Sequence, residues 1–507
     1  MNELLKLWKY FSASGSQSGN TKKQTVKTRL YDNTDKNTGY IQAKFDGSAD
    51  LTVRNLSVNE KRCAVVTIEG MCDKEALSLS VISPLLKSFY PDKTEKLELL
   101  GYIEKYVLSA SDISRTDNFE DLLQMIMSGF AVLIIEGCST AICIGVQGYS
   151  FRNVTEPESE VSERGSREGF VEPLHINMSL LRRRIKNPKL KMETMILGEL
   201  SKTEICLCYI TDAVSDSILK KLRDKLNSID IDTVLASGYL VSFLEDENDR
   251  SFFSGVGITE RPDTVGGKIN EGRIAVLIDG TPSALIVPYL FVENFQTMGD
   301  YSYKPYYATL IRWLKYLCFF VASLLPGIYI AVALFNPELF PEQILNQLET
   351  SIGNTPFSLV TEILLVLFMY EIMREAGLRL PKSLGHAVSI VGALVIGDTA
   401  VSAGLIVAPS LMIVAITAIA SYVIPNLYPQ LYVLRILFIF AGGILGIWGI
   451  VLLFCVLTVN VCGKSVLGVP YTMPVAPFNM FGMRDVAIRA DWKILGKKRT
   501  VIKDVAE

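Results

Sequence analysis

Short apolar runs alternate with amphipathic stretches between residues 51 and 301. The runs are rich in Val, Ile and Leu, as in β-strands, and the stretches have helical spacing. The predicted strands are 62–68, 130–135, 141–146, 192–197, 204–210, 274–278 and 284–287. The predicted helices include 74–89, 118–127, 178–185 and 215–226. This alternation predicts an α/β region.

Two parts of this region resemble each other. SGFAVLIIEGCSTAICIG ends at residue 145 and EGRIAVLIDGTPSALIVP ends at residue 288, each with a Gly-containing turn between two apolar runs. Asp-Gly in that setting is a strong hairpin signal. A strand and a helix precede each hairpin at a similar distance. We predict two related α/β subdomains, at 49–150 and at 151–305, the latter including a charged linker; chance resemblance of hairpins is the alternative.

The chain becomes strongly apolar after residue 305. Only 11 charged residues lie between 316 and 459, and about 20 helical residues cross the core of a bilayer. An α-helical membrane domain is therefore predicted at 306–460. Its predicted spans are 316–335, 357–373, 387–424 with a break at 397–404, and 436–459.

Loop charge indicates the orientation of these spans. The basic loop at 374–382 and the basic tail at 461–507 are expected in the cytosol, together with the N-terminal subdomains. An odd number of crossings is then needed within 387–424. One crossing plus a half-membrane piece fits that length, and a two-span hairpin, which would place the tail outside, is the alternative.

Residues 12–48 are rich in polar residues and contain few large apolar ones, and residues 1–11 have no continuous apolar core. Residues 1–48 are therefore predicted to be a disordered leader. The net charge of −3 provides no global polycation for nucleic acid. Nine cysteines without a disulfide spacing fit a reducing compartment.

Motifs of enzymes are missing from the sequence. HExxH, Walker A, GxSxG and a complete GxGxxG do not occur, and the two histidines lie far apart. We predict no catalytic activity, no cofactor and no metal centre.

A dense mixture of charges occupies residues 152–172, between the two predicted subdomains. A solvated linker is one interpretation, and a salt-bridged clasp between subdomains or subunits is the other. The candidate clasp residues are Arg152, Glu158, Arg164, Arg167 and Glu168.

Intramembrane carboxylates normally face a partner or water, because burying them in lipid is costly. Glu362 lies in a predicted span, and Asp398 lies in a Gly-rich break, a known way to build ion sites. Thr399 and Ser402 add hydroxyl groups, so the four residues form a candidate ion path. Alternatively, Glu362 has no ion-path role and Asp398 caps the next helix.

Gly442 and Gly446 form a GxxxG pattern in the last span. Small residues at this spacing allow close packing of helices, although the pattern alone is weak evidence of oligomerisation.

Four long stretches resemble the A subunit of GerA-type spore germination receptors. They are EPESEVSERGSREGFVEPLHINMSLLRRRIKNPKL, ERPDTVGGKINEGRIAVLIDGTPSALIVP, VIGDTAVSAGLIVAPSLMIVAITAIASYVIP and PVAPFNMFGMRDVAIRADWK. The chain departs from the family pattern at Ser166 and at Ala490-Asp491-Trp492, where the family usually has proline.

The resemblance implies a nutrient-gated receptor subunit in the inner membrane of a spore. It implies a permease-like B subunit and a lipoprotein C subunit as partners, and a homo-oligomer that conducts cations. An ion-coupled secondary transporter and a membrane-anchored scaffold are the alternatives. Four spans are few for a transporter, and a scaffold needs no helix break with a carboxylate.

Overall fold

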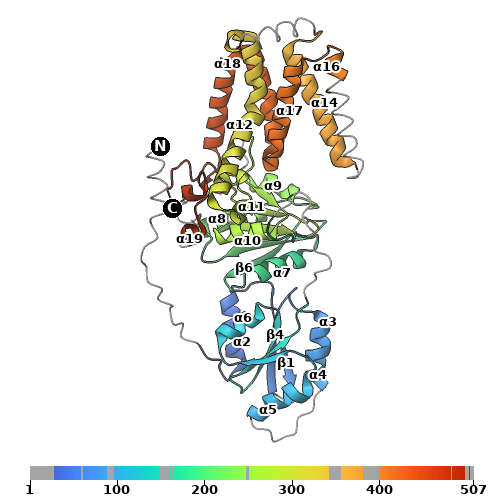
Figure 1. The fold of residues 1–507 in the computed structure, drawn as a ribbon. Coiled ribbons are helices and arrows are strands. Elements are labelled where there is room, and N and C mark those ends of the chain that lie inside the picture. Colours follow the sequence, from blue (N-terminus) through green and yellow to red (C-terminus); the bar gives the residue numbers. More distant parts are fainter. Residues whose placement is uncertain are drawn as a thin grey trace.

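The computed structural model describes residues 28–58, 61–87, 96–148, 160, 164–246, 251–341, 355–380, 397, 399–480, 482–496 and 502. Two sheet-containing units are followed by a helical domain, and the C-terminal segment returns to pack beside the second unit (Figure 1).

The first sheet unit is built on five antiparallel strands. The order across the sheet is β1-β2-β4-β5-β3. The strands are β1 (Leu51–Val58), β2 (Lys61–Ile68), β3 (Ile113–Thr116), β4 (Phe130–Ile135) and β5 (Ala141–Gly145). The helices are α2 (Thr34–Phe45), α3 (Lys74–Leu77), α4 (Ser83–Lys87), α5 (Lys96–Tyr102) and α6 (Phe119–Ile126).

The second sheet unit has an equivalent strand order, β6-β7-β9-β10-β8, also antiparallel. The strands are β6 (Leu190–Leu197), β7 (Thr203–Ile210), β8 (Gly257–Thr259), β9 (Ile274–Ile278) and β10 (Ala284–Val287). The helices are α7 (Leu174–Arg184), α8 (Asp216–Asn227), α9 (Gly238–Leu244) and α10 (Pro262–Asn270).

The predicted hairpins are β4–β5 and β9–β10. Their turns contain Gly137 and Gly280, whose φ angles of +83° and +84° favour glycine.

The disordered leader is wrong for residues 34–45, which form the helix α2. Asn33 caps this helix, and Ile41 and Phe45 are fully buried on the first sheet unit. Two apolar residues four positions apart give the helix a buried face, even though the surrounding residues are polar. Residues 1–27 lie outside the described residues.

A buried arginine joins the two sheet units. Arg182 of α7 is completely buried and donates to both carboxylate oxygens of Asp50, at 2.7 and 2.9 Å. It also donates to Ser48 Oγ and to the carbonyl of Leu190. The forked guanidinium thus holds the turn before β1 against the start of β6.

The helical domain begins with α12 (Pro305–Phe335) and continues through α14 (Leu359–Arg379), α16 (Ala400–Ser402), α17 (Ala408–Tyr422) and α18 (Tyr428–Gly463). Within the described chain, two stretches are long and apolar enough to cross a membrane, Pro305–Phe335 and Pro425–Gly463. Residues 387–396 and Asp398 of the predicted span 387–424 lie outside the described residues. Its described part breaks between α16 and α17, where Gly404 has a φ of +65°.

The predicted single span at 436–459 is wrong, because α18 reverses at Gly446. Gly446 has φ +62° and ψ −145°, which are not helical angles. Before it, Arg435 contacts Ala322, and Gly446 itself lies against Phe335, so this arm follows α12 in the same direction. After it, the chain returns, with Phe454 beside Phe320.

The two arms of α18, residues 428–445 and 447–463, are each about 25 Å long. A reversing segment crosses an even number of times, so the parity argument for one crossing within 387–424 does not hold. Gly442 approaches Gly327 so closely that a Cβ on it would lie 2.4 Å from the Gly327 carbonyl oxygen. This glycine therefore packs α18 against α12 of the same chain.

Replacing Asp50 with alanine should destabilise the chain by about 3–5 kcal/mol, because Arg182 would remain buried without its carboxylate. The melting temperature of the full-length chain in detergent measures this loss. Asp46→Asn is the control: Asp46 pairs with Lys191 at the same boundary, but its side chain is 69% exposed, and Asn tolerates the left-handed backbone at this position (φ +47°). The control should lose no more than about 1 kcal/mol. Equal losses of stability in both variants would contradict the conclusion that the buried Arg182–Asp50 pair joins the two sheet units.

Candidate functional site

The candidate site is the junction where the second sheet unit meets the helical domain. Its centre is the base of α12, where Arg312 and Lys315 are buried although they stand on a long apolar helix. Arg312 and Lys315 both contact Asp300 of α11 (Met298–Ser302), at 3.3 and 3.1 Å. Charged groups at this depth persist only when they are paired.

The C-terminal segment completes this junction. Arg312 donates to Asp485, at 2.9 Å to the carboxylate and 2.5 Å to the backbone carbonyl. Tyr301 donates its hydroxyl to the same carboxylate, at 2.5 Å. One arginine therefore connects α11, α12 and the tail.

The other end of the helical domain is fastened to the same unit. Lys464 follows α18 directly, is nearly buried, and donates to the carbonyl of Phe253 at 2.5 Å. Tyr471 follows the short hairpin of β11 (Ser465–Val466) and β12 (Val469–Pro470), and its carbonyl accepts from Phe291 N–H. Thus α12 begins, and α18 ends, beside the second sheet unit.

A buried ionic group stabilises the loop that leads to α11. Arg273 and Lys268 both pair with Glu293, which is 2% exposed. Burial alone would raise the pKa of Glu293, but the two cations hold it below its ordinary value. The carboxylate of Glu293 also accepts from Leu290 N–H at 2.8 Å, which fixes the turn after β10.

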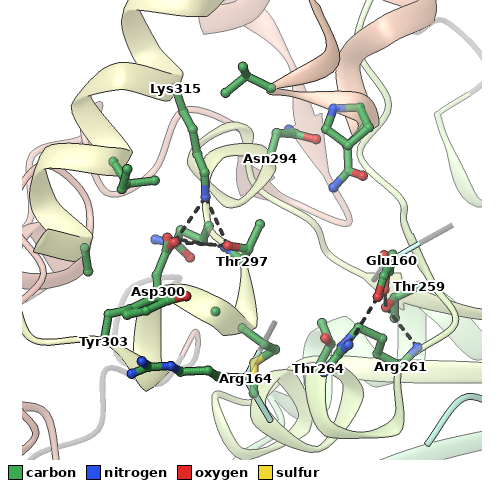
Figure 2. A pocket seen from close by; sticks show the side chains of 18 of the residues that line it. Glu160, Arg164, Thr259, Arg261, Thr264, Asn294, Thr297, Asp300, Tyr303 and Lys315 are labelled. Carbon is green, nitrogen blue, oxygen red and sulfur yellow. Dashed lines mark hydrogen bonds and ion pairs between the residues drawn. The ribbon is translucent and has the colours of Figure 1, made fainter. Parts of the chain in front are cut away.

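A cavity of about 400 Å³ opens between this junction and the charged linker (Figure 2). Asp300 and Lys315 lie on one wall, and Glu160 lies on the other, hydrogen-bonded by Thr259 at 2.6 Å. Burial raises the pKa of Glu160. Pro425 and its neighbours line the cavity from the turn between α17 and α18. The cavity therefore borders the second sheet unit, α12 and the turn between α17 and α18.

Two of the candidate clasp residues contact α7 and the residue that follows α11. The Arg164 guanidinium lies over the Tyr303 ring at 5.0 Å, beside the cavity. Glu168 pairs with Arg183 and Arg184 of α7. Arg167 is exposed. Arg152 and Glu158 lie outside the described residues, and the clasp between subdomains or subunits stays a prediction.

The candidate ion-path residues do not share one surface. Glu362 is fully buried in the first turn of α14, where its Oε1 accepts from Val407 N–H at 2.7 Å. Thr399 and Ser402 are exposed, and Asp398 lies outside the described residues. Gly446 forms the reversal in α18, and Gly442 packs within the chain, as described above.

The residues that carry the junction were not singled out from the sequence. They are Arg273, Glu293, Asp300, Arg312, Lys315, Lys464 and Asp485. Arg312 and Lys315 lie directly before the first predicted span. Basic residues at this position are typical of the cytosolic end of a membrane helix, so they indicate nothing further. Their burial is the distinguishing feature, and it depends on Asp485, 173 residues away. Among the described residues, no cluster of three His, Cys, Asp or Glu side chains could hold a metal ion.

Glu293 should make the stability of the chain depend on acid pH. Its folded pKa is below the ordinary value of 4.5, so its charged form favours folding above that pH, and this contribution is lost as the pH falls further. Glu293→Gln should flatten this decline below pH 4.5 and cost about 3 kcal/mol at pH 7.

Melting temperatures of the full-length chain across this pH range provide the measurement. Glu104→Gln is the control, because Glu104 pairs with Arg115 in the first sheet unit, where the pair is partly exposed. If the melting temperature of Glu293→Gln falls with acid as steeply as that of the wild type, carboxylates other than Glu293 cause the loss of stability.

Comparisons with known proteins agree on one family. The family model described as Bacillus/Clostridium GerA spore germination protein matches residues 39–501. Spore germination protein KA of Bacillus subtilis is 37% identical over 90% of this chain and 84% of its own length. Spore germination protein GerLA of Bacillus cereus is 32% identical over 92% of this chain and 94% of its own.

A solved structure is also similar. It is the crystal structure of the N-terminal domain of the A subunit of the Bacillus megaterium spore germinant receptor GerK3, at 32% identity and a TM-score of 0.41. The match covers 53% of this chain and 99% of that domain. Because the family model spans most of the residues and these relatives match along nearly the whole length, the chain belongs to the GerA family of spore germination proteins.

Proposed function

We propose that this chain is the non-enzymatic A subunit of a nutrient-germinant receptor and that it triggers spore germination as a ligand-gated cation channel. It would lie in the spore inner membrane, with both sheet units and the tail in the cytosol. Its partners would be a permease-like B subunit, a lipoprotein C subunit and further copies of itself. The names of the relatives support the receptor role.

The junction at Arg312 supports a gating role for the sheet units. A cytosolic unit would act on a pore through firm contacts with its helices. Arg312 holds the base of α12 to α11 and to the tail, and Lys464 holds the end of α18 to Phe253 of the second sheet unit. The equivalent strand orders of the two sheet units support a further proposal, that they arose by duplication.

The exposed faces of the helical domain support assembly of several copies. Trp448, Leu452 and Val456 on the second arm of α18 are each more than 60% exposed. In a membrane such a face contacts lipid or another helix. The pore wall would include Asp398, Thr399 and Ser402, with Glu362 inside each protomer. Arg164 and Arg167 remain the proposed contacts of a clasp.

Weakening the contacts of Arg312 and Lys315 should weaken the coupling between germinant binding and cation release. Asp300→Asn removes the charge shared by Arg312 and Lys315 while keeping the polar cap of α11. We expect the germinant concentration for half-maximal potassium release from spores to rise about 5- to 150-fold, the range of typical coupling energies. Asp212→Asn is the control, since Asp212 pairs with Lys189 in an exposed position. Normal release by Asp300→Asn spores, at equal receptor abundance on immunoblots, would contradict coupling through the junction.

Conduction itself needs a separate measurement. The purified chain in a planar bilayer should produce discrete single-channel currents carried by K⁺ or Na⁺. A transporter would move ions without discrete steps, and a scaffold would carry no current, so either result would contradict the channel.

A further inference from the structure

Three oxygen atoms from three helices converge in the interior of the helical domain. They are Glu362 Oε2 on α14, Tyr329 Oη on α12 and Ser410 Oγ on α17. Glu362 and Ser410 are completely buried, and Tyr329 is 6% exposed. The Ser410 side chain lies close to both other groups.

Ser410 Oγ lies within hydrogen-bonding reach of both other groups, but no contact of these three atoms with a described residue has the geometry of a regular hydrogen bond. Their surroundings are apolar and include Leu359, Ile363, Ile406 and Val414. Buried polar groups in native proteins are almost always satisfied, by protein atoms, water or an ion. Three buried oxygens that meet without regular hydrogen bonds therefore point to an occupant between them.

An ionised Glu362 would restrict what that occupant can be. In the described part of the chain, no lysine or arginine forms an ion pair with this carboxylate, whose Oε1 already accepts from Val407 N–H. A backbone N–H orients the carboxylate and offsets only part of its charge. A water molecule would satisfy the hydrogen bonds but leave a buried charge in an apolar environment. A cation satisfies both requirements.

We propose that Glu362, Tyr329 and Ser410 form a binding site for a monovalent metal cation inside each protomer. Carboxylate and hydroxyl oxygens are hard ligands, which suit Na⁺ and K⁺ as they suit other hard cations. A single carboxylate matches a single positive charge. The break before α17 leaves nearby backbone that is not helical, as at other intramembrane cation sites.

An occupied site would link α14 to α12 and α17. The charged carboxylate would otherwise disfavour this packing, so the cation stabilises the arrangement of the three helices. This inference concerns the interior of one chain and does not depend on whether the assembled protein conducts.

Cation-dependent thermal stability of the full-length protein in detergent tests the proposal. Melting temperatures are measured at pH 7.5 in NaCl, in KCl and in choline chloride at equal ionic strength. At a concentration about five times Kd, Na⁺ or K⁺ should raise the melting temperature by about 2–4 °C above choline. The increase should follow a saturable binding curve.

Three variants remove parts of the site. Glu362→Gln keeps an oxygen for Val407 N–H but removes the charge, and it should abolish the difference between metal cations and choline. Ser410→Ala and Tyr329→Phe keep the charge and remove one ligand each, so they should raise the Kd at least severalfold. Ser323→Ala is the matched control, because Ser323 is equally buried but its hydroxyl bonds to the Phe319 carbonyl of its own helix.

Two results would overturn the proposal. Equal melting temperatures of the wild type in all three salts would show that water or a protonated carboxyl group fills the site. A cation effect that persists unchanged in Glu362→Gln, Ser410→Ala and Tyr329→Phe would place the cation elsewhere. If Glu362→Gln fails to fold, the two hydroxyl variants still decide the question.

Discussion

Arg312 imposes the strongest constraint on this structure, because a fully buried guanidinium must be surrounded by acceptors. Its acceptors come from α11 and from the C-terminal segment, which is separated from it by the entire helical domain. The tail can therefore reach Arg312 only if the helical domain returns the chain to its starting point. The reversal of α18 at Gly446 makes this possible, since the second arm of that helix leads back to Lys464 and the second sheet unit.

The two sheet units differ in how they are connected to the rest of the molecule. The second unit holds both ends of the helical domain, whereas the first unit is joined to the second through Arg182 and neighbouring backbone contacts such as Ala49 N–H to the Met192 carbonyl. Each connection is a buried charged group with several acceptors. Shifting one element against the other would break these bonds and leave a buried charge without partners, so each connection has one favoured geometry. A displacement of the first unit would thus be transmitted through α7, and not through a flexible tether.

Local patterns in the sequence predicted the local parts of this fold. The hairpins β4–β5 and β9–β10 follow from turn residues between apolar runs, and the helix at 316–335 follows from its length without charge. The prediction of a disordered leader is wrong for α2 because this helix buries only a few apolar residues, such as Ile41 and Phe45. The average composition of residues 1–48 does not reveal them. The reversal at Gly446 was missed because a glycine inside an apolar run reads equally well as close packing in a straight helix. Contacts such as Arg182 to Asp50 and Arg312 to Asp485 depend on residues 132 and 173 positions apart, which no local pattern contains.

The candidate ion path shows that the position of a carboxylate along the chain does not predict which way its side chain faces. The sequence indicates an ion-path role for Glu362, because a charged residue within a membrane span needs a partner. The structure places Glu362 inside the helical domain, beside Tyr329 and Ser410. Arg435 is buried too, and it donates to the Ala322 carbonyl and Ser421. The helical domain therefore keeps these charges inside and presents apolar residues such as Trp448 outside, the reverse of a soluble protein. Any pore between copies would be lined by outward-facing groups such as Thr399 and Ser402. Glu362 would then act on such a pore through the packing of α14, and not by facing the ions that pass.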